Sequence, residues 1–357
     1  MTNKPTITIV IANYNGFDDL KICLRSIKKL SYPRVKTIVF DNNSPDKDGE
    51  KIKKGYPWVN LFAFKKNYGF CGGYNRVLET VKSPYVFLIN NDTVVTKNIL
   101  DTLVAHARKN PKVAIIQPKI LSLDHPHMFE YAGASGGYVD SLGYPFCRGR
   151  LLFYVEKDKG QYDEAAPIFW ASGTAMFCRL AAIKSVGLFD EDLFAYVEEH
   201  DLCWRVWLAG YRIVALPQAV IYHKGLGSWG KYLNKKIFLI HRNNLLVLVK
   251  NSSFRRLIII LPLRLLLDYV AVIYYLATGR PSFTISVVKA HMSVAWLFSR
   301  FWKKRGKLQK GELQLMWPRS IVFTYFVRGI RKFSDLAPKR DPRGVLITNT
   351  VYRQKPG

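Results

Sequence analysis

Short runs of β-branched and aromatic residues recur along the first quarter of the chain, and small polar residues follow three of the four runs. Four such runs occupy residues 6–12 (TITIVIA), 35–40 (VKTIVF), 60–64 and 85–89 (YVFLI). Runs of this length and composition predict buried strands. Residues 20–29 and 74–81 have the mixed apolar and polar spacing of amphipathic helices. The alternation of strands and helices predicts an α/β fold with a Rossmann-like, doubly wound and mostly parallel sheet.

The middle of the chain gives a weaker pattern. Residues 117–177 show no sustained periodicity, and within them residues 133–143 are rich in Gly and Tyr and predict a loop. Farther along, residues 193–208 predict a helix, and residues 214–222 predict a strand that ends at His223.

The last third of the chain is both apolar and basic. Residues 257–277 are strongly apolar but include Arg264 and Asp268, and residues 283–301 include a Lys and a His. A helix that crosses a membrane needs about 20 apolar residues with few charges. The charges therefore favour helices that lie in the membrane interface, with a buried helical subdomain or true spanning helices as the alternatives. The expected division of the chain is an α/β domain over 1–240, a basic helical segment over 241–335 and a polar tail over 336–357.

The composition adds a strong positive charge. The chain has 54 Lys and Arg against 26 Asp and Glu, a formal net charge of +28. Such an excess predicts nucleic acid, an anionic membrane leaflet or a phosphate-bearing substrate as partner. No helix-turn-helix, RNA-recognition or zinc-finger pattern occurs, so nucleic acid is not expected. The five cysteines form no CxxC pair and the polar N-terminus has no apolar signal segment, which predicts a reducing, cytoplasmic location.

Candidate chemistry lies where the predicted strands end. Asn13, Asp41 and the triplet Asn90-Asn91-Asp92 each follow a strand. Ligands of doubly wound sheets bind beyond the carboxyl ends of the strands, so we expect these side chains at one edge. A carboxylate there can bind Mg²⁺ or Mn²⁺ together with diphosphate oxygens. The triplet is also typical of a turn or a helix cap.

An acidic cluster, Glu198-Glu199-His200-Asp201, is the second candidate. Three acids within four residues repel one another, which raises the proton affinity of at least one of them. A carboxylate with a raised pKa suits a general base, whereas the alternative is an acid-rich first turn of a helix. His223 is a candidate metal ligand, although a lone His is more often structural. Residues 67–75 form a Gly-rich approach to a helix, which suits phosphate but matches neither the dinucleotide nor the Walker pattern.

Taken together, these segments resemble the family 2 glycosyltransferases, which have the GT-A fold, and within them the bacterial rhamnosyltransferase-like branch. The resemblance rests on seven segments in the same order, at residues 10–15, 39–44, 67–75, 88–93, 171–175, 198–202 and 222–223. It covers about residues 6–250 and includes Arg242-Asn243-Asn244, to which it assigns no role.

The resemblance implies a role for each matching residue. Donor-binding positions would be Ala12, Asn13, Tyr14, Asn15, Asp41, Asn67, Gly72, Gly73, Asn75, Asn90, Asn91 and Asp92. Asp92 would bind the metal and His223 would complete its shell. Glu199 would be the catalytic base, with Asp201 and Glu198 as rivals. The chain departs from the family where Asn90 replaces the first acid of the DxD motif and Glu199 replaces Asp.

The activity implied is inverting transfer of a sugar from a nucleotide-sugar donor, dependent on Mg²⁺ or Mn²⁺. The branch favours dTDP-rhamnose, and UDP-sugars remain open. Family habit and the basic, apolar C-terminal third together favour a polyprenyl-diphosphate-linked glycan acceptor at an anionic membrane surface, on the cytoplasmic face of the plasma membrane, for surface polysaccharide synthesis. A nucleotidyltransferase and a non-catalytic scaffold that binds nucleotide sugars are the alternatives.

Overall fold

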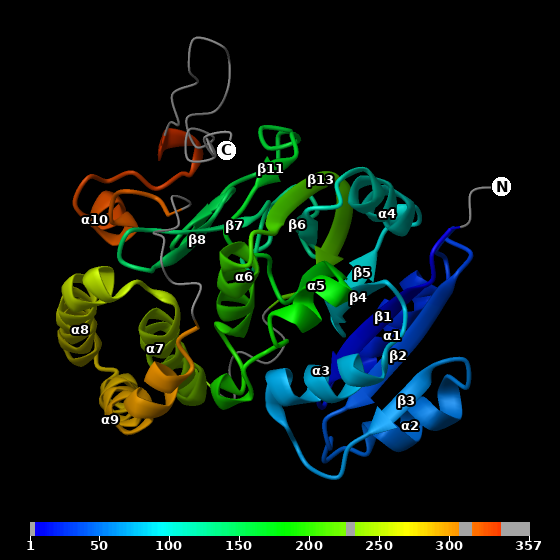
Figure 1. Ribbon diagram of the computed structural model, residues 1–357, viewed down its shortest axis with the longest axis horizontal. Coiled ribbons are helices and arrows are strands. Elements are labelled where there is room, and N and C mark those ends of the chain that lie inside the picture. The colour runs from blue at the N-terminus through cyan, green and yellow to red at the C-terminus, as the bar shows by residue number, and fades with distance from the viewer. Residues whose placement is uncertain (1–3, 226–232, 307–315, 337–357) are drawn as a thin grey trace.

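The computed structural model describes residues 4–225, 233–306 and 316–336 (Figure 1). Its strands are β1 (Ile7–Asn13), β2 (Val35–Asp41), β3 (Asn60–Ala63), β4 (Tyr85–Asn90), β5 (Thr93–Val95), β6 (Val113–Ser122), β7 (Gly137–Val139), β8 (Pro145–Cys147), β9 (Arg150–Leu151), β10 (Tyr154–Val155), β11 (Ala166–Pro167), β12 (Ala175–Arg179) and β13 (Arg212–His223). Its helices are α1 (Phe17–Ile27), α2 (Asp48–Gly55), α3 (Gly69–Thr80), α4 (Ile99–Lys109), α5 (Leu180–Ser185), α6 (Glu198–Leu208), α7 (Leu233–Asn251), α8 (Phe254–Ala277), α9 (Pro281–Lys303) and α10 (Ile321–Phe326), with short 3-10 helices at Glu191–Leu193 and Ser334–Leu336.

The central sheet has the order β11-β13-β6-β12-β4-β1-β2-β3, and β5 pairs with β13. The pairs β1–β2, β1–β4, β2–β3 and β6–β13 are parallel, as predicted. In contrast, β12 runs antiparallel between β4 and β6, because the chain returns from the carboxyl edge of the sheet after β6. The excursion between β6 and β12 carries a second, antiparallel sheet of β7 to β10, which the sequence pattern did not reveal.

Helices cover both faces of the central sheet because its strands are apolar on both sides. Ile7, Ile9 and Ile11 pack with buried residues of α1 and α4, whereas Val10 packs with α3 on the opposite face. Successive side chains of a strand point to opposite faces, so a run without polar residues requires two covering layers. The α/β fold class is therefore confirmed.

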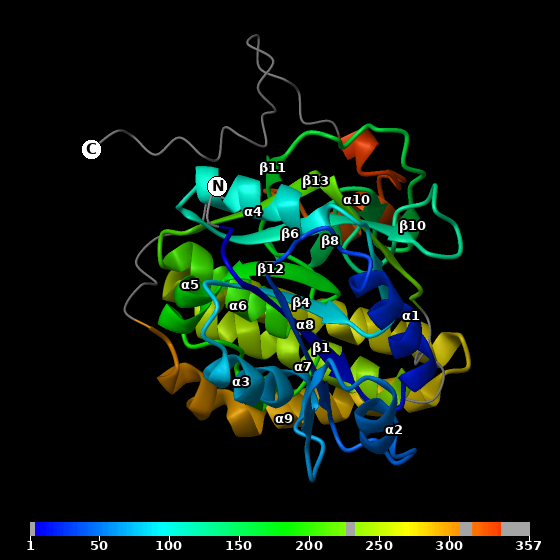
Figure 2. The same ribbon diagram turned by 90° about the vertical axis from the view of Figure 1, so that its right-hand side faces the viewer.

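The helices α7, α8 and α9 form a helical unit that packs on α6. In Figure 1 this unit lies on one side of α6, and β1, β2 and β3 lie on the other side. Figure 2 looks onto the β1–β3 side, with the helical unit behind it. The expected boundary at residue 240 falls inside α7, so a division there would cut a continuous helix. The expected polar tail lies outside the described residues from position 337 onward.

Candidate active site

The carboxyl ends of β1, β2 and β4 meet at Asn13, as the sequence predicts. The strand register pairs Asn13 with Asp41. The buried Asn13 amide donates to Asp41 Oδ1 and Asp48 Oδ2, each at 3.1 Å. Its Oδ1 accepts a hydrogen bond from Asn91 Nδ2 at 2.9 Å. The side chains of Asn13 and Asp41 are therefore occupied by hydrogen bonds to neighbouring segments at this edge of the sheet. They support the edge and are not free to face a ligand.

The turn after β1 offers more accessible groups. Tyr14 is 41% exposed. Asn15 has a φ of 49°, a conformation that Asn tolerates better than most residues, and its N–H donates to Ser44 Oγ at 2.9 Å. Ala12 and Asn90 are half-buried beside this turn. The predicted donor residues of β1 and β4 thus lie at one edge, and Tyr14 and Asn15 are the ones that a ligand can reach most directly.

We predicted a Gly-rich loop followed by a helix from residue 74. The helix α3 begins earlier, at Gly69, so most of the Gly-rich segment is helical. A Cβ atom on Gly73 would lie 2.5 Å from the Phe40 ring. Asn75 is buried and exchanges two hydrogen bonds with the Phe189 backbone, at 2.9 and 3.1 Å. Gly73 and Asn75 therefore pack α3 against the sheet and against the segment before α6. Gly72 is also buried, whereas Asn67 is exposed and its side chain accepts a hydrogen bond from Gly69 N in its own turn.

Asp92 and His223 are brought together by strand pairing. The strand β5 begins directly after Asp92 and pairs with β13 in a register that sets Thr93 opposite His223. Asp92 Oδ1 lies 3.0 Å from His223 Nε2. On the other side of the ring, His223 Nδ1 lies 3.3 Å from Glu130 Oε2. The imidazole is thus enclosed by two carboxylates, and Glu130 was not predicted from the sequence.

These contacts do not satisfy the polar atoms involved. Both ring nitrogens of His223 and Asp92 Oδ1 are buried without a hydrogen bond of good geometry. Burial acts to lower the pKa of His223, but Asp92 and Glu130 outweigh burial and raise it to about 10. Positive charge is therefore strongly favoured between Asp92 and Glu130.

A divalent cation fits the pair of Asp92 and His223. An octahedral Mg²⁺ with ligands at about 2.1 Å separates neighbouring ligand atoms by about 3.0 Å. Asp92 Oδ1 and His223 Nε2 have this separation, and both lack other partners. Among the described residues, no group of three or more His, Cys, Asp or Glu side chains could hold a metal ion. A cation at the pair would therefore need further oxygen ligands, such as those of a diphosphate.

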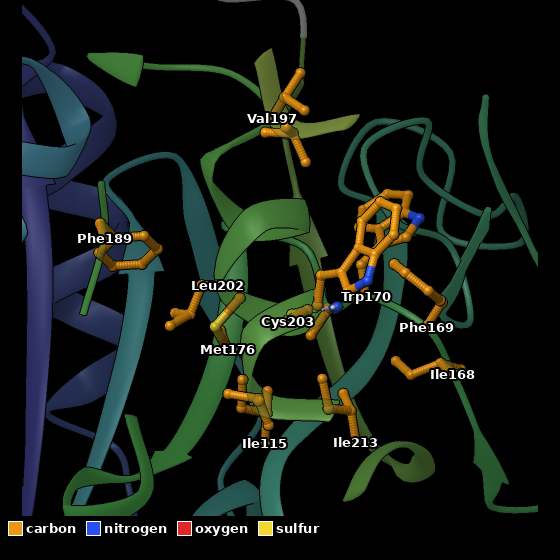
Figure 3. Packing of buried hydrophobic residues seen from close by; sticks show 14 of the residues in the cluster. Ile115, Ile168, Phe169, Trp170, Met176, Phe189, Val197, Leu202, Cys203 and Ile213 are labelled. Carbon is orange, nitrogen blue, oxygen red and sulfur yellow. Dashed lines mark hydrogen bonds between the residues drawn. The ribbon is translucent and has the colours of Figure 1, made fainter. Parts of the chain in front are cut away.

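The acidic cluster lies on the first turn of α6, and the helix begins later than predicted. The predicted helix started at residue 193, but Leu193 ends a 3-10 turn and α6 begins at Glu198. Leu202 and Cys203 anchor α6 in the core near Met176 and Trp170, with Val197 at the start of the helix (Figure 3). The start is displaced because Phe194, Tyr196 and Val197 have positive φ angles of 65°, 65° and 70°.

The three acids of this turn have different surroundings. Asp201 is fully buried and receives hydrogen bonds from Arg205 Nε at 2.9 Å, Lys250 Nζ at 3.0 Å and Asn251 Nδ2 at 2.8 Å. Burial acts to raise the pKa of Asp201, but Arg205 and Lys250 hold it well below its usual range. Asp201 is therefore ionised and tied into the structure.

Among the described residues, Glu198 and Glu199 have no such cationic partners. Burial, and then the charge of Glu199, raise the pKa of Glu198 well above its usual value. Burial raises the pKa of Glu199 to about 7. One carboxylate oxygen of each residue is buried without a partner, but the Glu199 side chain is still 18% exposed. The adjacent His200 remains neutral, because burial, and then Arg150, lower its pKa to about 3.

Sequence reasoning missed the residues that support this site from a distance. Asp48 accepts from Asn13 and from Gly16 N, Glu130 faces His223, and Lys250 binds Asp201. Their partners are 32 to 93 positions away, so no local pattern points to them. Only the acidic and basic composition around Asp201 hinted at compensating charges.

Comparisons with known proteins agree with this architecture. A sequence model described as "Glycosyl transferase family 2" matches residues 8–133, and one described as "Glycosyl transferase family group 2" matches residues 85–300. An N-acetylglucosaminyl-diphospho-decaprenol L-rhamnosyltransferase of Mycobacterium tuberculosis is 23% identical over 261 residues, which cover 69% of this chain and 85% of that protein. A poly-beta-1,6-N-acetyl-D-glucosamine synthase of Staphylococcus aureus is 22% identical over 221 residues, which cover 60% of this chain and 49% of that protein.

Solved structures give the same fold at low sequence identity. GalNAc-T7 with UDP, GalNAc and Mn²⁺ has a TM-score of 0.54 at 17% identity, over 70% of this chain and 48% of that one. The mannosyltransferase PcManGT from Pyrobaculum calidifontis, in complex with GDP-Man and Mn²⁺, has a TM-score of 0.50 at 13% identity, over 86% of each chain. The fold is GT-A, and the molecule is a glycosyltransferase. The chain belongs to the family 2 glycosyltransferases.

Proposed function

We propose that this glycosyltransferase inverts the configuration of the transferred sugar and uses Glu199 as its catalytic base. The observation that carries the assignment is the contrast among the three acids of α6. Asp201 is bound by Arg205 and Lys250, and Glu198 is 4% exposed, whereas the Glu199 side chain is 18% exposed and has a pKa of about 7. A general base works best when its pKa lies near the working pH and the acceptor can reach it.

The reaction would be a single displacement. The acceptor hydroxyl oxygen attacks the anomeric carbon from the face opposite the leaving group, and a new C–O bond forms. The bond between that carbon and the diphosphate oxygen breaks, and the nucleoside diphosphate leaves with the electron pair. Glu199 takes the hydroxyl proton. No covalent enzyme intermediate is required, so no enzyme nucleophile is needed.

Asp92 and His223 would bind a divalent cation, which would neutralise the charge that develops on the diphosphate. Tyr14 and Asn15 would contact the nucleotide, on an edge shaped by Asn13 and Asp41. Glu130 would orient the His223 ring from the side away from Asp92, since ligating His residues commonly place their second nitrogen against a carboxylate.

The proposed donor is dTDP-rhamnose, and the proposed acceptor is a polyprenyl-diphosphate-linked glycan used for surface polysaccharide. The rhamnosyltransferase relative, of which the alignment covers 85%, supports this choice. A UDP-sugar is the second candidate, because the relatives also include a poly-N-acetylglucosamine synthase, although the chain spans about half of its length. A non-catalytic scaffold is disfavoured, since donor binding alone does not require a carboxyl group with a raised pKa, such as that of Glu199.

We further propose that the helical unit docks on the cytoplasmic leaflet of an anionic phospholipid bilayer. Among the described residues, α8 alone is long and apolar enough to cross a membrane. The two charged residues within its apolar stretch, Arg264 and Asp268, face inward, however, and are each 2% exposed. The outer surface of the unit carries exposed large apolar side chains at Ile258, Ile259, Leu263, Leu266, Tyr269, Val270, Ile273, Tyr274, Leu276, Ile285, Val288, Met292, Trp296 and Trp302.

So many exposed apolar side chains are unusual for helices that pack on a soluble core. Exposed cations lie among the apolar groups, at Arg255, Arg280, Lys289, Arg300 and Lys303. Apolar side chains at headgroup depth, with cations between them, suit an anionic leaflet. Interfacial docking therefore explains the surface better than a buried subdomain does.

A donor screen tests the enzymatic proposal. The full-length protein is incubated with dTDP-rhamnose and with common UDP- and GDP-sugars, with Mn²⁺ or Mg²⁺, and release of the nucleoside diphosphate is measured. We expect turnover of dTDP-rhamnose, loss with chelator, and loss of about 10²- to 10⁴-fold in Glu199→Gln. His125→Ala, at an exposed histidine outside the site, should match the wild type. Full activity in Glu199→Gln would reject the base, and turnover of a UDP-sugar alone would reject the donor.

A further inference from the structure

The segment between the 3-10 turn and α6 has an unfavourable backbone. Phe194, Tyr196 and Val197 all have positive φ angles, between 65° and 70°. Such conformations are unfavourable for residues other than Gly, and they are rarest for β-branched residues such as Val. They persist only where surrounding contacts fix the chain. This segment leads directly into Glu198 and Glu199, so the contacts that fix it also fix the entry into the acidic turn.

One side chain from α7 provides three of these contacts. Asn243 is fully buried, and its Nδ2 donates to the carbonyl oxygens of Leu193 at 2.9 Å, Ala195 at 2.9 Å and Tyr196 at 2.7 Å. A side-chain amide thus takes the place of the backbone donors that a regular helix would supply. These three carbonyls flank the residues with positive φ.

The neighbouring Arg242 determines which way this amide points. Arg242 Nε donates to Asn243 Oδ1 at 2.8 Å, so Nδ2 must face the carbonyls. The other end of the guanidinium donates to the carbonyls of Asp192 at 3.1 Å and Leu193 at 3.0 Å. Arg242 and Asn243 therefore act on the same segment as a pair.

The same helix also binds the far side of the acidic turn. Lys250 and Asn251 of α7 donate to the Asp201 carboxylate at 3.0 and 2.8 Å. Asn243 and Lys250 are seven positions apart, which is about two helical turns, so they lie on one face of α7. Glu199 lies between the two attachments, and α7 supports the chain both before and after it.

We propose that Asn243 is a positioning residue that sets the direction of the Glu199 carboxylate through the strained segment 193–197. The inference rests on the proposed role of Glu199 as base. Asn243 does not touch the reacting atoms. It fixes the strained segment that leads into α6, and misplacement of a catalytic group by about 1 Å can cost about 100-fold in rate.

The test compares Asn243→Ala with Asn244→Ala in the full-length protein. Asn244 is also buried in α7, but its amide donates only to Ile240 O of its own helix at 2.9 Å, so it is a matched control. We expect Asn243→Ala to lower kcat by about 10- to 100-fold while the donor KM stays within about twofold. The acid limb of its pH–rate profile, which Glu199 controls, should also shift. Asn244→Ala should keep both the rate and the profile.

A second variant and a second measurement guard against misfolding and against failure of the base assignment. Arg242→Met leaves Asn243 in place but removes the Nε donor that orients it, and we expect a smaller loss of kcat in the same direction. Deuterium exchange of the amides of residues 193–200 should rise in Asn243→Ala and in Arg242→Met, but not in Asn244→Ala. Exchange can be measured without enzymatic activity. It therefore shows whether Asn243 fixes the segment 193–197 even if Glu199→Gln proves fully active.

Two results would overturn the proposal. In the first, Asn243→Ala has the kcat, pH–rate profile and exchange of Asn244→Ala. In the second, exchange of residues 193–200 rises but kcat and the pH–rate profile do not change, which would make the Asn243 contacts structural only. A wild type that turns over no donor would reject the proposed function, and unchanged exchange would then reject the role of Asn243 separately.

Discussion

Glu199 and Asp201 are two residues apart on α6, and their surroundings give them opposite acid–base properties. Asp201 has Arg205, Lys250 and Asn251 as partners, which keep it ionised. Glu199 has burial without cations, which raises its pKa to about 7. A proton acceptor must be ionised in the resting enzyme and basic enough to take a proton, so environment selects between two residues of the same chemical type.

The raised pKa of Glu199 predicts the pH dependence of activity. The base works only when ionised, so below pH 7 the reactive fraction falls with the protonation of Glu199. We expect kcat/KM to decline about tenfold for each pH unit below 7 and to level off above pH 8. A pH–rate profile of donor turnover at saturating Mn²⁺ checks this. Residual activity of Glu199→Gln should show no such limb, and a wild-type profile that stays flat down to pH 5 would contradict the assignment.

The helix α3 packs on β2 so closely at Gly73 that the site has no room for a side chain. A Cβ at Gly73 would lie 2.5 Å from the Phe40 ring, and the ring is buried among Phe64 and Tyr74, which limits its movement. The family resemblance assigned Gly73 to donor binding. The close approach of α3 and β2 also accounts for a glycine at this position.

This packing predicts a loss of stability in Gly73→Ala. The added methyl group must displace a buried aromatic ring, and overpacking of this kind costs about 1–3 kcal/mol. Gly55→Ala is the control, because Gly55 ends α2 with no atom within 4 Å of its Cβ position. Urea unfolding should show a lower midpoint for Gly73→Ala and an equal or higher one for Gly55→Ala. A Gly73→Ala protein as stable as the wild type, but with weaker donor binding, would favour the donor-binding role.

The sequence alone was sufficient for elements whose signal is local. Four strands follow from apolar runs, and three of these runs stop at Asn or Asp. The start of α6 was wrong, because a run such as 193–208 looks helical while Asn243, 47 to 50 positions away, stabilises a non-helical entry. Glu130, Asp48 and Lys250 were missed for the same reason. Their roles depend on partners that only the folded chain brings near.

The helical unit is joined to the transferase core by charges as well as by packing. Lys250 of α7 binds Asp190 at 2.7 Å, and Arg300 of α9 binds Asp192 at 2.6 Å, both at the segment before α6. The inner surface of the unit is also polar, since Asp268 lies 3.0 Å from His241 and 2.9 Å from His291. The unit therefore meets the core through ion pairs and through part of its apolar surface, and the remaining large apolar side chains face outward.

The exposed apolar side chains of α8 and α9 predict that the whole molecule binds lipid through these two helices. Ile273 is 66% exposed on α8, and Ile22 is 44% exposed on α1, which belongs to the transferase core. Burying an isoleucine in the bilayer is worth about 1.5–3 kcal/mol, so Ile273→Asp should weaken binding to anionic vesicles about tenfold or more, whereas Ile22→Asp should not. Sedimentation with vesicles of phosphatidylglycerol and phosphatidylcholine measures this. Release by high salt would support interfacial docking. Retention after alkaline carbonate would indicate that α8 spans the bilayer, and equal sedimentation of both variants would mean that another surface binds the lipid.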